Sequence, residues 1–152
     1  MRQKKEEWME LTWSKQMSVG NETIDSEHKV ILDLVKNIDR VIREKDNELF
    51  SVALKQLEEA TRKHFEHEEK IAQAVNYPFE EHNLEHQYIL GEFLIIKDEL
   101  ASSQGRWSES IAEHYLEFLT TWAIDHVIED DMKMKPLLET YPYDFKPDGL
   151  MS

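Results

Sequence analysis

The sequence predicts an all-α fold, namely an antiparallel up-down four-helix bundle with irregular N- and C-terminal arms. Its 152 residues include only four glycines and four prolines, too few for the closely spaced turns that sandwiches and barrels need. Four long segments repeat apolar residues at intervals of three and four, which is the period of one helix face. Short connectors join these segments, and short connectors make consecutive helices antiparallel neighbours.

The first two predicted helices extend from about Ser26 to Glu44 and from about Glu48 to Val75. The face of the first helix that should be buried consists of His28, Val30, Ile31, Leu34, Val35, Ile38, Val41 and Ile42. The corresponding face of the second helix consists of Phe50, Ala53, Leu57, His64, Glu68, Ile71 and Val75. Both faces therefore combine a core pattern with titratable side chains.

The third predicted helix extends from Phe79 to about Leu100, and the fourth from near Ser108 until Pro136 limits it. Serine is favoured at a helix N-terminus because its hydroxyl accepts a backbone hydrogen bond. Histidines again occupy positions that should be buried, namely His82 and His86 on the third helix and His126 on the fourth.

We expect a single domain, with an N-terminal arm over 1–22, the bundle over about 23–138 and a C-terminal arm over about 139–152. The net charge of −14 disfavours nucleic acid and anionic membranes as partners. Because no stretch is apolar enough to span a bilayer or to act as an export signal, we expect a cytoplasmic protein without membrane insertion. Cysteine is absent, which leaves chemistry to histidine, carboxylate and hydroxyl groups.

The inward histidines and carboxylate need a common explanation, because a buried polar group without a partner is strongly unfavourable. His64 and Glu68 are four residues apart, as are His82 and His86, so each pair projects from one helix face about one turn apart. Two ligands of one metal ion have this spacing. A lone buried histidine is more often a hydrogen-bonded core residue, but the presence of such groups on all four helices favours a metal site.

Ligand spacing excludes several kinds of metal site. A ferritin-like di-iron bundle uses Glu-x-x-His, and no histidine here follows a glutamate by three residues. A zincin uses His-Glu-x-x-His, whereas Asn83 follows His82. More than four groups point inward, so two metal ions fit better than one structural zinc. Ligand type alone leaves iron, manganese and zinc open.

The motifs, taken in order, resemble those of the hemerythrin family, and more closely its short stand-alone bacterial members, the bacteriohemerythrins. The resemblance covers nearly the whole chain and is specific through the separations of its parts. These parts are Trp13-Ser14, Val19-Gly20, Ile24-Asp25-Ser26-Glu27-His28, His64-Phe65-Glu66-His67-Glu68-Glu69, Tyr77-Pro78, His82 and His86, and Trp122-Ala123-Ile124-Asp125-His126 followed by Asp131.

This resemblance implies a non-heme di-iron centre. One iron ion would bind His82, His86 and His126, the other would bind His28 and His64, and the bridges would be Glu68, Asp131 and an oxo or hydroxo group. Three bridges and three imidazoles complete six-coordination at the first ion. The second ion has one imidazole fewer, and dioxygen would bind there as a ligand.

The position of the second bridging carboxylate is ambiguous from spacing alone. His126 and Asp131 are five residues apart, or about 140° around an ideal helix, too far for one narrow stripe. Asp130 would be the simpler choice, but the resemblance implies Asp131. We therefore expect the fourth helix to be widened locally, for example by a π-type turn, or the carboxylate to reach in from the flank.

The oxygen pocket should be apolar, because water and protons would promote oxidation of the ferrous state. Its expected lining is Ile31, Phe65, Trp122, Ala123 and Ile128, with Trp13 as a cover. Ala123 departs from the family, which often has a bulkier leucine there, so a more open pocket is expected. His67 is expected on the flank, hydrogen-bonded to a neighbour or to water, and His114 is expected to be exposed.

The leading hypothesis for function is reversible dioxygen binding for storage or delivery, with an oxygen-consuming enzyme as one potential recipient. Such a protein is a binding protein and not an enzyme, and we expect a monomer. One alternative is an oxygen, redox or nitric-oxide sensor that acts through a partner. Another is a di-iron peroxidase or oxidase, or an iron-handling protein. An enzyme would need a proton donor near the open site, and His67 is the first candidate.

Overall fold

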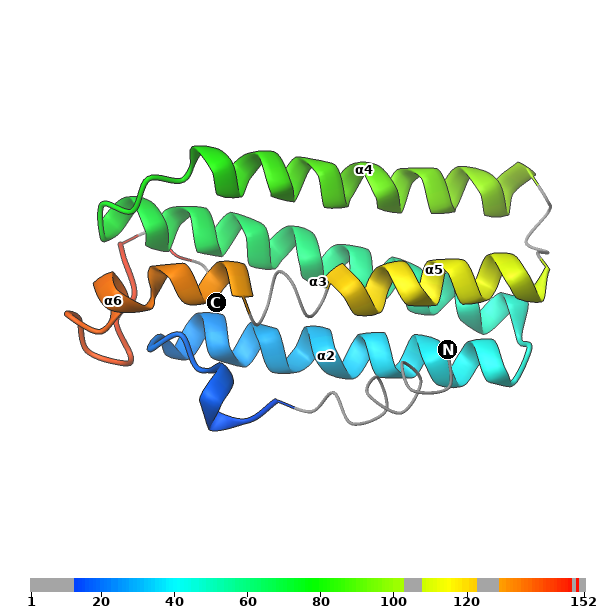
Figure 1. The fold of residues 1–152 in the computed structure, drawn as a ribbon, viewed down its shortest axis with the longest axis horizontal. Coiled ribbons are helices and arrows are strands. Elements are labelled where there is room, and N and C mark those ends of the chain that lie inside the picture. The colour runs from blue at the N-terminus through cyan, green and yellow to red at the C-terminus, as the bar shows by residue number, and fades with distance from the viewer. Residues whose placement is uncertain (1–12, 103–107, 123–128, 149, 151–152) are drawn as a thin grey trace.

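The computed structural model describes residues 13–102, 108–122, 129–148 and 150 (Figure 1). Within these residues every regular element is helical, which confirms the predicted all-α class. The long helices are α2 (Glu22–Arg43), α3 (Asn47–Ala74), α4 (Glu80–Ser102) and α5 (Glu109–Trp122). The short ones are the 3-10 helices η1 (Lys15–Met17) and η3 (Asp131–Met134), and the helix α6 (Lys135–Leu138).

The long helices lie side by side with alternating directions, as an up-down bundle requires (Figure 1). The fourth helical position of the bundle is occupied by α5 and, further along the same line, by α6. The connectors explain the antiparallel order. Only three residues separate α2 from α3, and the left-handed Lys45 (φ 58°) turns the chain there. Asp46 then caps α3, because its side chain accepts a hydrogen bond from the Leu49 backbone N–H at 3.0 Å.

Helix α2 begins four residues before the predicted Ser26, because Asn21 is its cap. The Asn21 side chain accepts a hydrogen bond from the Ile24 backbone N–H at 3.2 Å. The chain enters this cap through Gly20, whose φ of +84° is the left-handed conformation that glycine adopts without strain. The motif Gly20-Asn21 is therefore the start signal of α2.

Two clusters of buried apolar side chains form the core. The larger lies between the four long helices and includes Ile31, Phe50, Phe93 and Leu119. The smaller lies where both arms meet the bundle and consists of Val19, Ile24, Ile71, Ala72, Val75, Met134 and Leu138, with Tyr141, Phe145 and Leu150 packed against it.

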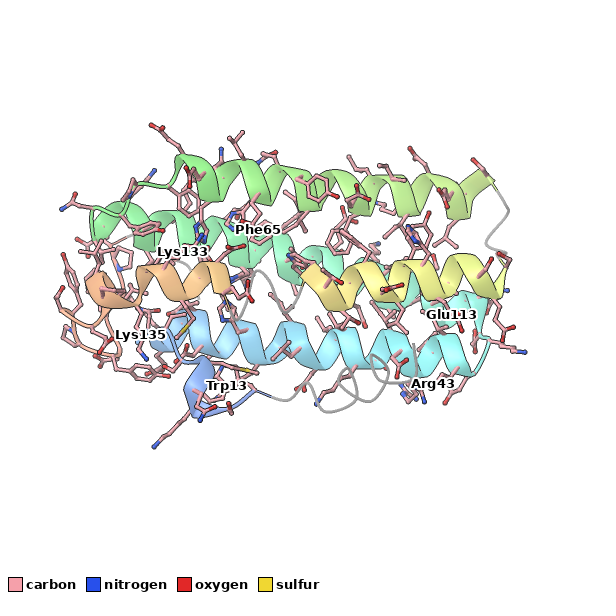
Figure 2. All side chains as sticks on the ribbon, in the orientation of Figure 1. Trp13, Arg43, Phe65, Glu113, Lys133 and Lys135 are labelled. Carbon is pink, nitrogen blue, oxygen red and sulfur yellow. The ribbon has the colours of Figure 1, made fainter. Side chains whose placement is uncertain are left out.

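Hydrogen bonds hold both arms to the start of α2. Asp25 is 1% exposed and accepts hydrogen bonds from Ser18 Oγ at 2.5 Å, the Val19 backbone N–H at 3.0 Å and Tyr143 Oη at 2.8 Å. Trp13 (Figure 2) packs against the larger core cluster. Lys29 Nζ lies 4.3 Å from its ring centroid. The described parts of the arms are therefore docked, although they contain little regular structure.

Two details of the predicted helices were wrong. Val30 was placed on the buried face of the first helix, but it is 52% exposed, because it follows the inward His28 by two residues, about 200° around the helix. Pro136 does not end the fourth helical segment. It lies in the first turn of α6, where proline is tolerated because no helical partner for its missing N–H is needed.

None of the helices in the described part of the chain has both the length and the apolar character needed to cross a membrane.

Candidate metal centre

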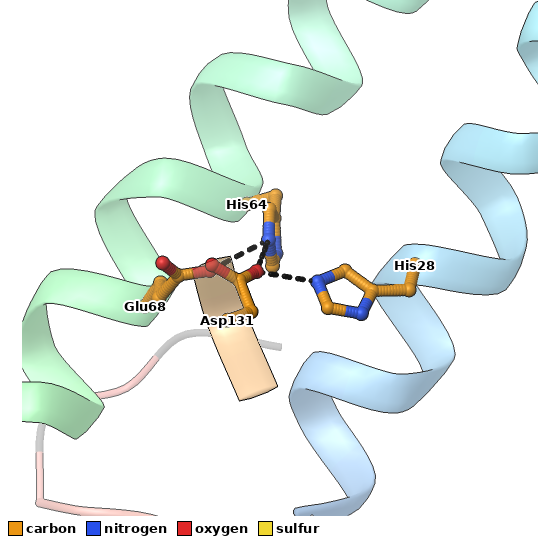
Figure 3. A group of neighbouring side chains, drawn as sticks. All are labelled: His28, His64, Glu68 and Asp131. Carbon is orange, nitrogen blue, oxygen red and sulfur yellow. Dashed lines mark hydrogen bonds and ion pairs between the residues drawn. The ribbon is translucent and has the colours of Figure 1, made fainter. Parts of the chain in front are cut away.

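Six of the seven predicted ligands lie within the described residues, and all six converge at one buried place. They are His28 from α2, His64 and Glu68 from α3, His82 and His86 from α4, and Asp131 from η3. Four of them, shown in Figure 3, are fully buried, and the other two are at most 5% exposed. His126, Ala123 and Ile128 lie outside the described residues.

Each of the two carboxylates divides its oxygens between two groups of histidines. Glu68 Oε2 lies 2.9 Å from His64 Nε2, whereas its Oε1 lies 3.0 Å from His82 Nε2 and 3.3 Å from His86 Nε2. Asp131 repeats the pattern, with Oδ2 2.7 Å from His28 Nε2 and Oδ1 2.8 Å from His82 Nε2. The eight donor atoms thus form two adjacent sets, and both sets share both carboxylates.

The spacing of these donor atoms fits metal coordination. In an octahedral site with bonds of about 2.1 Å, neighbouring donor atoms are about 3.0 Å apart. The N···O separations between the histidines and the carboxylates range from 2.7 to 3.5 Å. Imidazole and carboxylate ligands without sulfur suit iron, manganese or zinc. The residues present can therefore hold two neighbouring metal ions.

Electrostatics give the cluster a strong attraction for positive charge. Burial alone would lower the pKa of His82, but its hydrogen bonds to Asp131 and Glu68 outweigh burial and raise the pKa to about 10. The pKa of His64 is also raised well above its usual value, against the effect of burial, by Asp131, Glu27 and Glu68. Metal ions can supply the same charge, and their binding displaces protons from these imidazoles.

The helix geometry explains how these side chains meet. The pairs on α3 and α4 project inward because residues four apart share a helix face. Asp131 follows directly after Glu129 and Asp130, which are π-helical, as the expected local widening requires. Asp130 points away from the cluster, with a side chain 20% exposed and 3.5 Å from Lys133 Nζ. The structure thus places Asp131, and not Asp130, among the candidate ligands.

The comparison with known proteins agrees with this geometry. Residues 19–138 match the family described as the Hemerythrin HHE cation binding domain. The chain belongs to the hemerythrin family. Bacteriohemerythrins from three strains of Pseudomonas aeruginosa are 22% identical to it over 121 residues, which cover 80% of this chain and 76% of theirs.

Aromatic side chains hold the α4 histidines of this hemerythrin domain in place. The Phe65 ring stacks on His86, with centroids 3.6 Å apart and planes within 4°. Phe79 lies against both α4 histidines, at 5.4 Å from His82 and 5.3 Å from His86. Tyr77 meets His82 edge-on at 5.8 Å. Since these rings restrict rotation of the imidazoles, they keep the Nε2 atoms directed at the carboxylates.

Three described members of the expected oxygen pocket are buried in the core. Ile31, Phe65 and Trp122 belong to the larger core cluster and are 1%, 5% and 5% exposed. Trp13 packs against the same cluster from the N-terminal arm. The position of these residues is compatible with the expected lining, and their role in binding a ligand remains a prediction.

Glu27, for which the sequence predicted no role, links two histidines next to the centre. Glu27 Oε1 accepts a hydrogen bond from His64 Nδ1 at 2.8 Å, and Oε2 accepts one from His67 Nδ1 at 2.5 Å. Burial tends to raise the pKa of Glu27, but these hydrogen bonds lower it overall, so the carboxylate is an acceptor only. His64 must then donate from Nδ1, which directs its Nε2 at the cluster.

His67 is hydrogen-bonded to a neighbour, as predicted. It was expected on the flank of its helix, but it is only 4% exposed and therefore buried. His114 is exposed, as predicted. Glu27 could not be found from periodicity, because its role depends on how α2 packs against α3. Its position directly before His28 was the one available signal.

We predict that Asp131→Ala removes most of the bound metal, whereas Asp130→Ala retains it. The first substitution deletes a ligand shared by both sets of donors, and the second removes an equal charge from a neighbouring residue that points away. Metal content of the purified variants, measured by inductively coupled plasma mass spectrometry, tests this. Loss of metal in the Asp130 variant alone would contradict the assignment.

We also predict that Glu27→Ala weakens metal binding by roughly 10- to 100-fold, the usual effect of losing a group that orients a ligand. Glu27→Gln should be milder, because its amide oxygen can still accept from His64. Anaerobic competition between the protein and a ferrous chelator measures the affinity. Glu66→Ala is the matched control, since Glu66 is exposed on α3 and its loss removes the same charge. Equal affinities of the Glu27→Ala and Glu66→Ala variants would refute an orienting role.

Proposed function

We propose that this chain binds dioxygen reversibly at a non-heme di-iron centre, for storage or for delivery to an oxygen-consuming enzyme. The supporting observation is that both buried carboxylates are shared between two groups of histidines. The residues that would hold the ions are His28 and His64 on one side, His82, His86 and His126 on the other, and Glu68 and Asp131 between them. Ferrous ions in such a pair supply one electron each to dioxygen and recover it on release, the chemistry that reversible binding requires.

The protein's part in this function is to provide ligands and to exclude water. His28 and His64 would leave their ion one ligand short of the other, because among the described residues no third histidine joins their set of donors. Ile31 follows His28 by one turn of α2 and is 1% exposed. Apolar side chains at this side leave water and protons little access, which slows irreversible oxidation.

The position of His67 supports binding over catalysis. A peroxidase or oxidase needs an acid or base within hydrogen-bond reach of the reacting atoms. His67 was the first candidate for that role, but its Nδ1 donates to Glu27, and Glu27 holds His64 through its other oxygen. His67 therefore acts, in this proposal, on the orientation of a ligand.

We expect an absorption band in the visible range that appears when oxygen is added to the anaerobically reduced, iron-loaded protein. The band should disappear when oxygen is removed and should return over several cycles. The Asp131→Ala variant, treated in the same way, should show no such band. Immediate and irreversible return of the wild-type protein to the ferric form would contradict reversible binding and would favour a sensor or an oxidase.

A further inference from the structure

Helix α4 has apolar side chains on two opposite faces. Its inward face carries the buried residues His82, His86, Ile89, Phe93, Ile96 and Leu100. Its outward face carries Leu84, Tyr88, Leu94 and Ile95, whose exposed fractions are 72%, 62%, 50% and 49%. A surface helix of a globular protein usually has one apolar face, and a helix that is apolar all round is usually covered on all sides. The outward face of α4 therefore has the composition of a contact surface.

The residues of this outward face are also spaced regularly. Leu84, Tyr88, Gly91 and Ile95 follow one another at intervals of four, three and four, the spacing with which helices pair along a seam. At 100° per residue they lie on one side of α4, across the helix from the buried histidines. Single exposed apolar residues are common, but a continuous stripe over three turns is not.

Gly91, in the middle of this stripe, has no explanation within the described chain. Glycine is unfavourable in the middle of a helix, and it is kept where a turn or a close approach requires it. A Cβ atom at Gly91 would have no atom within 4 Å, so no neighbour in the described structure requires glycine here. A backbone that approaches α4 closely from outside would require it.

The charge of α4 indicates what kind of partner would approach it. Helix α4 has six carboxylates against Lys97 alone, so its net charge is −5. Glu85, Glu92 and Glu99 are seven residues apart and form a row along one side of the stripe. A second copy of the chain would bring like charges together, which opposes pairing. A helix with lysine or arginine beside its apolar seam would be complementary.

We propose that the outward face of α4 is a docking surface for an amphipathic helix of another protein, with an apolar seam and basic flanks. The seam covers Leu84, Tyr88 and Ile95, and the partner backbone approaches closest at Gly91. Leu84 and Tyr88 lie in the same turns of α4 as His82 and His86. The partner is thus separated from the metal centre by the thickness of one helix, about 10 Å. The proposal does not depend on which molecule the centre binds.

A synthetic peptide tests the proposal directly. The probe is a 21-residue helical peptide with leucine at the seam positions and lysine beside them, and the comparison peptide has glutamate in place of lysine. We expect saturable one-to-one binding of the lysine peptide by titration calorimetry, at least tenfold tighter than that of the glutamate peptide. Hydrogen exchange should be slowed in α4 on binding.

Matched variants separate docking from general attraction to an acidic protein. The pair Leu84→Ser and Tyr88→Ser should weaken binding of the lysine peptide at least tenfold. The control pair, Leu49→Ser and Val52→Ser, alters exposed apolar residues of α3, which are 46% and 53% exposed, and should change affinity less than twofold. Both pairs keep the net charge, so nonspecific attraction is the same. Equal weakening by the two pairs would overturn the proposal.

Gly91→Leu gives a test in which folding and docking change in different directions. Its Cβ atom would have no neighbour within 4 Å in the described chain, and leucine replaces a poor helix former, so thermal stability and metal content should be kept or increased. Affinity for the lysine peptide should nevertheless fall at least tenfold. Unchanged affinity would overturn the proposal, as would a Tyr88-dependent dimer in sedimentation velocity experiments, because a second copy would then be the occupant.

Discussion

The structure depends on two buried carboxylates, Glu68 and Asp131. Each of them needs a hydrogen-bonding or positively charged partner at both of its oxygens. Both are fully buried, and each has histidine nitrogens next to both of its oxygens. Two adjacent buried carboxylates repel each other and lose their hydration, so the pair is unfavourable without compensating positive charge. The carboxylates come from α3 and η3, and the imidazoles come from α2, α3 and α4. This requirement therefore sets the position along the bundle at which these elements must meet.

Other features of the fold serve that alignment. Asn21 and Asp25 fix the start of α2, and His28 follows Asp25 by three residues on the same helix. Tyr143 binds Asp25 from the C-terminal arm, so both arms brace the end of the bundle that carries the centre. Glu27 then links α2 to His64 of α3. The centre is therefore supported by contacts that lie outside the set of ligands, which is typical of metal sites whose ligands are held in advance of binding.

Much of the fold and most of the candidate site could be predicted from the sequence, for a physical reason. Helical periodicity determines which residues share a face, so the inward positions of His64, Glu68, His82 and His86 follow from their spacing. Periodicity carries no information on how one helix packs against another, so the pairing of Glu27 with His67 was missed. For the carboxylate on the fourth helical segment, periodicity alone favours the wrong residue. An ideal helix would favour Asp130, and a π-helical turn at residues 129–130 reverses the choice.

The proposed oxygen chemistry depends on two metal ions that share both carboxylates. Mössbauer spectroscopy of the oxidised protein loaded with iron-57, combined with iron quantification, measures this most directly. We predict two iron ions per chain and a diamagnetic ground state, because ions that share bridging ligands couple their spins. One iron ion per chain, or two ions with independent magnetic spectra, would contradict a shared pair of bridging carboxylates.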